Sequence, residues 1–157
     1  MRGPWIAGAY YNRPDAIDRF TPDGWFKTGD IVTIDDCATI QVQDRSKDLI
    51  KSGGEWISSV ALECALMGHP SVAEAAVFAV RHPKWDERPV AAVVLKPGAK
   101  ASADELRAYL APQFARFWLP DAFEFIDAIP RTSAGKFKKS ALREQFKDYR
   151  LADATIG

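Results

Sequence analysis

The 157-residue chain predicts an α+β fold, a small domain in which a short β-sheet is flanked by helices and accompanied by a β-hairpin. Three observations predict it. Short β-branched runs are typical of strands, serines precede apolar residues at helical spacing, and the two kinds of segment alternate without the regular rhythm of parallel βαβ units. A chain of this length can bury about 70% of its unfolded surface, enough for one core.

The first part of the chain is dense in proline and glycine. Residues 1–30 hold three prolines and four glycines, and we expect loops there. Two β-branched runs between residues 31 and 42, separated by an aspartate pair, predict a hairpin. Polarity rises after Asp44, so we place a domain boundary there and divide the chain into segments 1–45 and 46–157.

The next segment predicts a tight hairpin followed by a helix. The turn Ser52-Gly53-Gly54 separates two short β-forming runs within residues 49–57, and its glycines can adopt positive φ. Ser58 or Ser59 can cap a helix that Gly68 ends.

Two long β-branched runs follow, at residues 72–80 and 90–95, with residues 81–89 as the expected connection. The second run is apolar throughout, which suits a strand covered on both faces. The remaining expected elements are a helix opened by the capping box Ser102–Glu105 and ended near Pro112, a strand over 123–126 and a helix over 139–148.

Composition excludes several function classes. The 21 basic and 21 acidic residues leave a net charge of zero, so no overall field attracts nucleic acid. His69 and His82 lack ligand-spaced partners, and we expect no metal site. Nothing approaches the ~20 apolar residues of a membrane span, nor a secretory signal. With Cys37 and Cys64 far apart in sequence, we expect a soluble, cytoplasmic protein with reduced thiols.

Charge is nevertheless uneven along the chain. Between Arg131 and Arg150 there are seven cations and only two anions. Two interpretations are open, a solvated basic helix or a surface that faces polyphosphate.

Three motifs carry the chemistry: Thr28-Gly29-Asp30, the stretch from Asp44 to Ile57, and Pro130-Arg131-Thr132-Ser133-Ala134-Gly135-Lys136. In order and spacing they resemble the last motifs of adenylate-forming enzymes, the superfamily of acyl-CoA synthetases, luciferases and peptide-synthetase adenylation domains. The version Gly53-Gly54-Glu55-Trp56 resembles the fatty-acyl-CoA ligase branch. The resemblance implies that segment 1–45 trails a large N-terminal domain and that 46–157 is the C-terminal lid domain of a synthetase.

Lys136 is the expected catalytic residue. Acyl adenylate formation requires a carboxylate oxygen to attack the α-phosphate of ATP, and these anions repel unless a cation lies between them. A lysine beside a glycine can place a compact charge there. An isolated Gly-Lys pair is most often a solvated loop; the upstream motifs favour the catalytic interpretation.

Other roles come from the resemblance. Asp30 and Arg45 are expected at the ribose of the nucleotide, as acidic residues are in dinucleotide folds, although Thr-Gly-Asp alone is typical of a turn. Trp56 can stack on adenine, cover an acyl chain or belong to the core. Lys47 matches the hinge about which the lid rotates, or is an exposed linker lysine.

Gly53 and Gly54 match the position where the pantetheine arm of CoA passes the backbone, or are ordinary turn glycines. The implied substrates are a fatty acid, ATP and CoA, and Mg²⁺ is expected mainly on the large domain. The chain alone lacks a phosphate loop and is expected to be inactive. Without its large domain, the aromatic residues of segment 1–45 are expected to be mobile or to contact one another.

Two other functions stay open. One is an adenylation domain that loads a carrier protein, and the other is a non-catalytic module that retains the lid fold.

Overall fold

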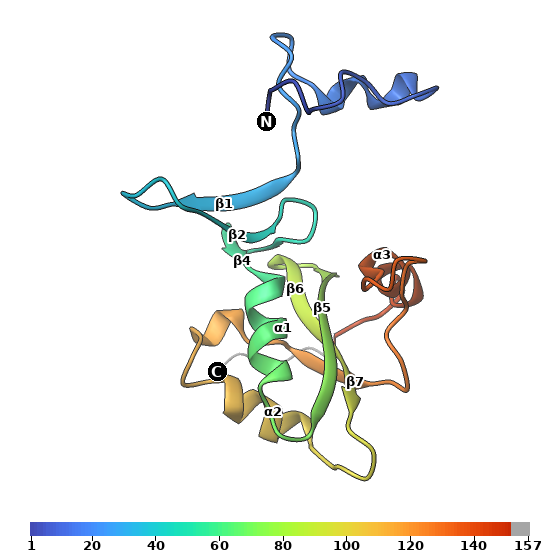
Figure 1. The fold of residues 1–157 in the computed structure, drawn as a ribbon. Helices are drawn as coiled ribbons and strands as arrows, with labels where there is room; N and C mark the ends of the chain where they lie inside the picture. Colours follow the sequence, from blue (N-terminus) through green and yellow to red (C-terminus); the bar gives the residue numbers. More distant parts are fainter. Residues whose placement is uncertain (152–157) are drawn as a thin grey trace.

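A computed structural model describes residues 1–151. The first 29 residues are loops with one 3₁₀ helix, Pro14–Arg19, and lead into an antiparallel hairpin of β1 (Asp30–Ile34) and β2 (Ile40–Arg45). This hairpin was expected, and it extends away from the rest of the chain (Figure 1). The rings of Phe20 and Phe26 contact each other at 5.3 Å.

The aromatic self-contact is incomplete. Tyr10 joins Phe20 and Phe26, whereas the Trp5 side chain is 95% exposed. Several apolar side chains of β1 and β2 are exposed as well, among them Ile34, Ile40 and Val42. This end of the chain therefore exposes several apolar side chains that its own fold does not cover.

The larger sheet has five strands: β3 (Ile50–Ser52), β4 (Glu55–Ile57), β5 (Val72–His82), β6 (Asp86–Leu95) and β7 (Ala122–Phe125). They follow the order β4-β3-β6-β5, and β7 pairs parallel with β6. All other pairings are antiparallel. Since β3 meets β6 only through Ser52 and Asp86, β3 and β7 share one edge of β6 at different heights.

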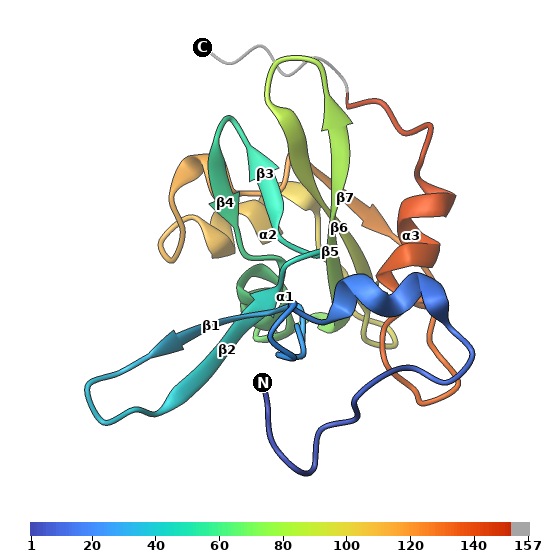
Figure 2. The ribbon, with the colours of Figure 1, turned by 90° about the horizontal axis from the view of Figure 1, so that it is seen from above.

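Helices cover both faces of this sheet (Figure 2). Side chains of α1 (Ser59–Met67) and α2 (Ala103–Leu110) pack on one face with the odd-numbered residues of β5 from Ala75 onward. Side chains of α3 (Lys139–Gln145) pack on the other with the even-numbered ones from Ala76 onward. A short 3₁₀ turn, Arg116–Trp118, follows α2. The α+β fold is confirmed.

The helix caps follow the sequence. The Ser58 hydroxyl accepts the Ala61 N–H at 3.2 Å at the start of α1. Ser102 and Glu105 form the expected capping box of α2, which ends at Leu110. Each cap satisfies backbone donors that the first helical turn leaves free.

One connection is shorter than expected. The strands β5 and β6 continue to His82 and Asp86, so only residues 83–85 turn the chain. The tip of this hairpin lies beyond the two cores, where polar residues such as Arg81 and Glu87 pair across the ladder. Because no apolar pattern is needed there, these strand ends could not be recognised from the sequence.

A β-bulge near the start of β5 changes which face its side chains meet. Val72 pairs with Leu95 and Glu74 with Val94, so Ala73 is an extra residue. Val72 lies in the core under α1 and α2, whereas the even-numbered residues after the bulge face α3. A one-residue insertion in a strand has this effect because side chains alternate with period two.

Candidate functional site

Lys136 lies in the loop between β7 and α3. Its ammonium makes no hydrogen bond or ion pair within residues 1–151. Four of the seven cations between residues 131 and 150 are paired within the chain: Arg131 with Glu74, Lys139 with Glu63, Arg143 with Asp48 and Lys147 with Glu144. Much of the basic run therefore holds the fold together, and Lys136 is left available to a ligand.

Asp30 and Arg45 lie side by side. They are cross-strand partners at the open end of β1 and β2, and the Arg45 Nε lies 3.0 Å from the Asp30 carboxylate in an ion pair. Gly29, at φ +78°, precedes this pair, and its carbonyl accepts the Ser46 N–H. The two residues that were expected at one ribose thus meet in the structure, half-exposed beside the linker.

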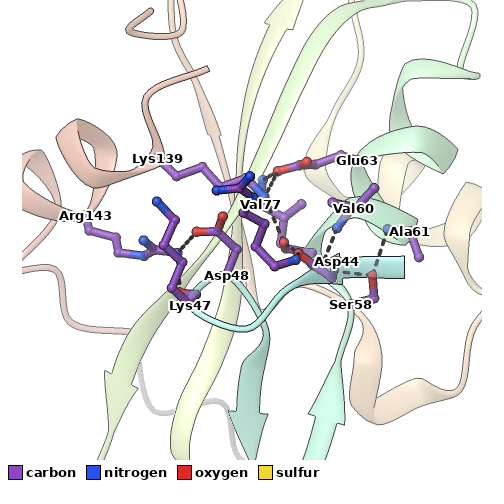
Figure 3. Close-up of polar contacts among 12 residues, drawn as sticks. Asp44, Lys47, Asp48, Ser58, Val60, Ala61, Glu63, Val77, Lys139 and Arg143 are labelled. Atoms are coloured by element: carbon purple, nitrogen blue, oxygen red, sulfur yellow. Dashed lines mark hydrogen bonds and ion pairs between the residues drawn. The ribbon is translucent and has the colours of Figure 1, made fainter. Parts of the chain in front are cut away.

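The linker that follows is held on both sides of Lys47 (Figure 3). Upstream, the buried Asp44 carboxylate accepts bonds from the Ser58 and Ser59 hydroxyls, both at 3.0 Å. Downstream, Arg143 donates to Asp48 at 2.6 Å and to the Lys47 carbonyl at 3.2 Å. A turn of three residues, 45–47, lies between these two attachments.

A second polar pair lies deeper under the linker. Lys139 Nζ contacts the Glu63 carboxylate at 2.7 Å and donates to the Ser59 hydroxyl. The Val77 N–H also donates to Glu63, at 2.6 Å. Burial raises the pKa of Glu63, although Lys139 opposes the shift. This pair joins the first turn of α3 to α1 through the edge of β5 (Figure 3).

The glycine turn between β3 and β4 packs against the tip of the β5–β6 hairpin. Gly53 has φ +59° and donates its N–H to the Trp85 carbonyl, and a Cβ there would lie 2.8 Å from the Trp85 ring. Gly54 has φ +91° and has open space where a Cβ would be. Trp56 is 54% exposed, so the interpretation of Trp56 as a core residue is wrong.

A pocket of about 720 Å³ opens beside this glycine turn. Aromatic and basic side chains line it together, notably Trp85, Phe117, Arg107 and Arg116. Such a wall suits a ligand that has both an aromatic ring and phosphates. The pocket could not be predicted from the sequence because its residues come from four separate segments of the chain.

Arg88 forms the floor of the pocket and was not anticipated. Its guanidinium binds the Asp121 carboxylate with two bonds, at 2.8 and 2.6 Å. It also donates to the Ser52 hydroxyl at 2.9 Å and to the Phe117 carbonyl at 2.7 Å. One buried side chain therefore fixes the glycine turn relative to the aromatic wall.

The turn at Gly53 and Gly54 and the loop that carries Lys136 lie at opposite ends of the sheet (Figure 2). The glycine turn contacts β6 at Asp86, which pairs with His82. The Lys136 loop is tied to Glu74 near the other end of β5. A strand rises about 3.3 Å per residue, so Glu74 and His82 are roughly 26 Å apart along the ladder.

Neither a metal site nor a membrane-spanning helix is found in the part of the chain that the structure describes. Within residues 1–151 no group of three His, Cys, Asp or Glu side chains is close enough to hold a metal ion. No helix in the same range is both long and apolar enough to cross a bilayer.

Comparison with known proteins identifies the relatives. The family model described as AMP-binding enzyme C-terminal domain matches residues 61–136. A long-chain-fatty-acid–CoA ligase from Thermus thermophilus is 58% identical over 151 residues, 95% of this chain and 28% of the ligase. A medium-chain-fatty-acid–CoA ligase from Ectopseudomonas oleovorans is 42% identical over 154 residues, 98% of this chain and 28% of that ligase.

A solved structure is also similar to this chain. The o-succinylbenzoate CoA synthetase from Bacillus subtilis, in complex with its acyl-adenylate intermediate, superposes with a TM-score of 0.83 at 38% identity. The alignment covers 97% of this chain and 30% of that one. The chain therefore spans less than a third of the length of these relatives.

Proposed function

We propose, because this chain belongs to the family of AMP-binding enzyme C-terminal domains, that it forms the lid of an ATP-dependent fatty-acyl-CoA ligase. The lid works with a large domain, and segment 1–45 is the part of that domain next to it. The exposed apolar residues of that segment, among them Trp5 and Ile34, support such a neighbour. The fatty acid is inferred from the names of the long-chain and medium-chain relatives.

In the first half-reaction Lys136 acts at the reacting phosphate. A carboxylate oxygen attacks the α-phosphorus of ATP, the acyl–phosphate bond forms, and pyrophosphate leaves. The ammonium neutralises the charge that builds up between the two anions. Asp30 accepts hydrogen bonds from the ribose hydroxyls. The Arg45 Nε, 3.0 Å from the Asp30 carboxylate, holds that carboxylate in place. Mg²⁺ accompanies the ATP and is assigned to the large domain, because the described lid residues form no acidic cluster.

In the second half-reaction the glycine turn replaces the lysine loop. The CoA sulfur attacks the acyl carbonyl, the thioester forms, and AMP leaves. Gly54, which has open space where a Cβ would be, leaves room for the pantetheine arm, and Gly53 lets the turn pack on Trp85 beside that passage. Trp56 covers one side of the site. The pocket beside them offers Arg107 and Arg116 to the phosphates of CoA and the ring of Trp85 to its adenine.

The observation that carries this proposal is the separation of the two loops. Ends of one rigid ladder roughly 26 Å apart cannot occupy the same active centre at once. The lid must therefore turn between the half-reactions, and the linker around Lys47 is the proposed pivot, because segment 1–45 joins the lid there. Rotation then requires that the bonds from Ser58 and Ser59 to Asp44 open, since they hold segment 1–45 to the lid.

A chimaeric enzyme tests the proposal. This chain replaces the matched 151 residues of the Thermus ligase, and both half-reactions are measured in single turnovers, from acid plus ATP and from synthetic acyl adenylate plus CoA. Lys136→Ala should slow adenylation by roughly 10²–10³-fold and spare thioester formation. Equal loss of both steps would refute the assignment. Transfer to a carrier protein in place of CoA would favour the carrier-loading alternative.

A further inference from the structure

The loop that carries Lys136 is a closed hairpin with its own hydrogen bonds. Thr132 donates its N–H to the Lys136 carbonyl at 2.8 Å, and Lys138 donates to the Pro130 carbonyl at 2.7 Å. Gly135, at φ +77°, turns the chain between them. These bonds fix the shape of the loop. They do not fix its orientation relative to the sheet, because both partners of every bond lie within the loop.

Arg131 supplies that orientation. Its guanidinium lies 4.7 Å from the centre of the Phe137 ring and donates to the Gly135 carbonyl, so it ties the two arms of the hairpin together. The same fork donates to the Glu74 carboxylate on β5, 57 residues away in sequence. A planar guanidinium can serve the three partners at once, whereas an ammonium cannot.

The bulge in β5 makes this contact possible. Were Ala73 not inserted, Glu74 would share a face with Val72 and point toward α1 and α2. With the insertion it lies on the face of Phe78, which packs with Phe137 in the core under α3. Bulges commonly re-aim one side chain in this way. The bulge at Ala73 therefore directs the Glu74 carboxylate toward Arg131.

We propose that Glu74 is a positioning residue for adenylation, acting through Arg131 on the direction in which the loop presents Lys136. The inference rests on the proposed function of Lys136. The Glu74–Arg131 pair is partly exposed, and such pairs contribute little to global stability. Its effect is therefore on geometry, since a reacting group must be held within ~0.5 Å of its productive position.

The first test uses the chain itself and measures loop order without any catalysis. Glu74→Gln keeps the shape of the side chain and removes the charge that holds Arg131. Because the Arg131 guanidinium that Glu74 holds also ties the two arms of the loop through the Gly135 carbonyl, its release should loosen the loop. Hydrogen exchange at the Thr132, Gly135 and Lys138 amides should become roughly 3–10-fold faster, while exchange in β5 and β6 is unchanged. Glu144→Gln is the matched control, because it breaks another exposed ion pair, between Glu144 on α3 and Lys147 just after that helix.

The second test uses the chimaeric ligase. Glu74→Gln should reduce the rate of acyl adenylate formation by roughly 10–100-fold, the order expected for a displaced catalytic group. The rate of thioester formation from acyl adenylate should stay within about twofold of the parent, because the glycine turn lies at the far end of the ladder. Arg131→Lys keeps the charge but loses the forked guanidinium. Its rate of acyl adenylate formation should lie between those of Glu74→Gln and the parent.

Three results would overturn the inference: unchanged exchange in the loop, unchanged adenylation, or an equal loss of both half-reactions with a lowered melting temperature, which would indicate a merely structural role. A parent chimaera that cannot adenylate would refute the proposed function instead. In that case the exchange measurement still decides whether Glu74 orients the loop.

Discussion

Replacing Lys139 with methionine tests the buried ion pair that joins α3 to α1. The side chains of Lys139 and Glu63 are only 11% and 9% exposed, and their charged atoms lie 2.7 Å apart. Methionine fills a similar volume without charge. The Glu63 carboxylate is then left with the Val77 N–H alone. Breaking a buried pair in this way costs about 3–5 kcal/mol, and the melting temperature should fall by roughly 6–20 °C.

The loss should depend on pH. Burial already raises the pKa of Glu63 above its ordinary value of 4.5, and Lys139 holds the shift back. In Lys139→Met the pKa rises further, so the folded protein binds a proton more tightly than the unfolded chain. For such a group, stability is lowest above the folded pKa and recovers as pH falls toward 4.5. The deficit relative to the parent should be large at pH 7.5 and clearly smaller at pH 5.

Urea unfolding followed by circular dichroism at the two pH values measures this. Adding Glu63→Gln to Lys139→Met should restore most of the stability at pH 7.5, because the amide carbonyl can still accept the Val77 N–H and no charge stays buried. Lys147→Met, just after the end of α3, breaks an exposed pair and should cost less than about 0.5 kcal/mol. A deficit that is equal at both pH values, or a double variant no better than the single one, would refute the reasoning.

Three other predictions concern the proposed enzyme. The isolated chain should show no ATP–pyrophosphate exchange with any fatty acid, and exchange above background would contradict the need for a large domain. In the chimaera, Gly54→Leu should block thioester formation and spare adenylation. Gly98→Leu is its control, since that glycine has similar positive φ and open space but follows the end of β6 opposite to the glycine turn. Gly53→Ala should lower the melting temperature because a Cβ would meet the Trp85 ring at 2.8 Å, and an unchanged melting curve would show that the ring can move away.

Local elements were predictable from sequence, and long-range polar contacts were not. The glycine turn at Gly53 and the capping box at Ser102 depend on residues within a few positions of one another, so their chemistry is visible in the chain. The buried contacts of Arg88 join residues 29 to 36 positions apart. No local pattern specifies them, because each partner alone resembles an ordinary polar surface residue.

The candidate site, too, could be predicted only in part from the sequence. The motifs identified Lys136, Asp30 and Arg45, and the structure brings the last two into contact, while their role at a ribose stays a prediction. The roles of Lys136, Lys47 and Gly54 stay predictions. The bulge at Ala73 could not be predicted from the sequence because the apolar run that follows it, residues 75–80, suits both faces of a covered strand. Its consequence for Glu74 could be read only once the register of β5 and β6 was known.

The length of the β5–β6 ladder also sets an angular tolerance. A rigid body roughly 26 Å long displaces one end by about 0.45 Å for each degree of tilt about the other. A catalytic group tolerates an error of about 0.5 Å, so in the proposed enzyme the lid must stop within roughly one degree of its productive orientation in each half-reaction. A three-residue turn between Asp44 and Asp48 can allow rotation but cannot define an angle so finely. That accuracy has to come from surfaces far from the pivot, where the lid meets its neighbour.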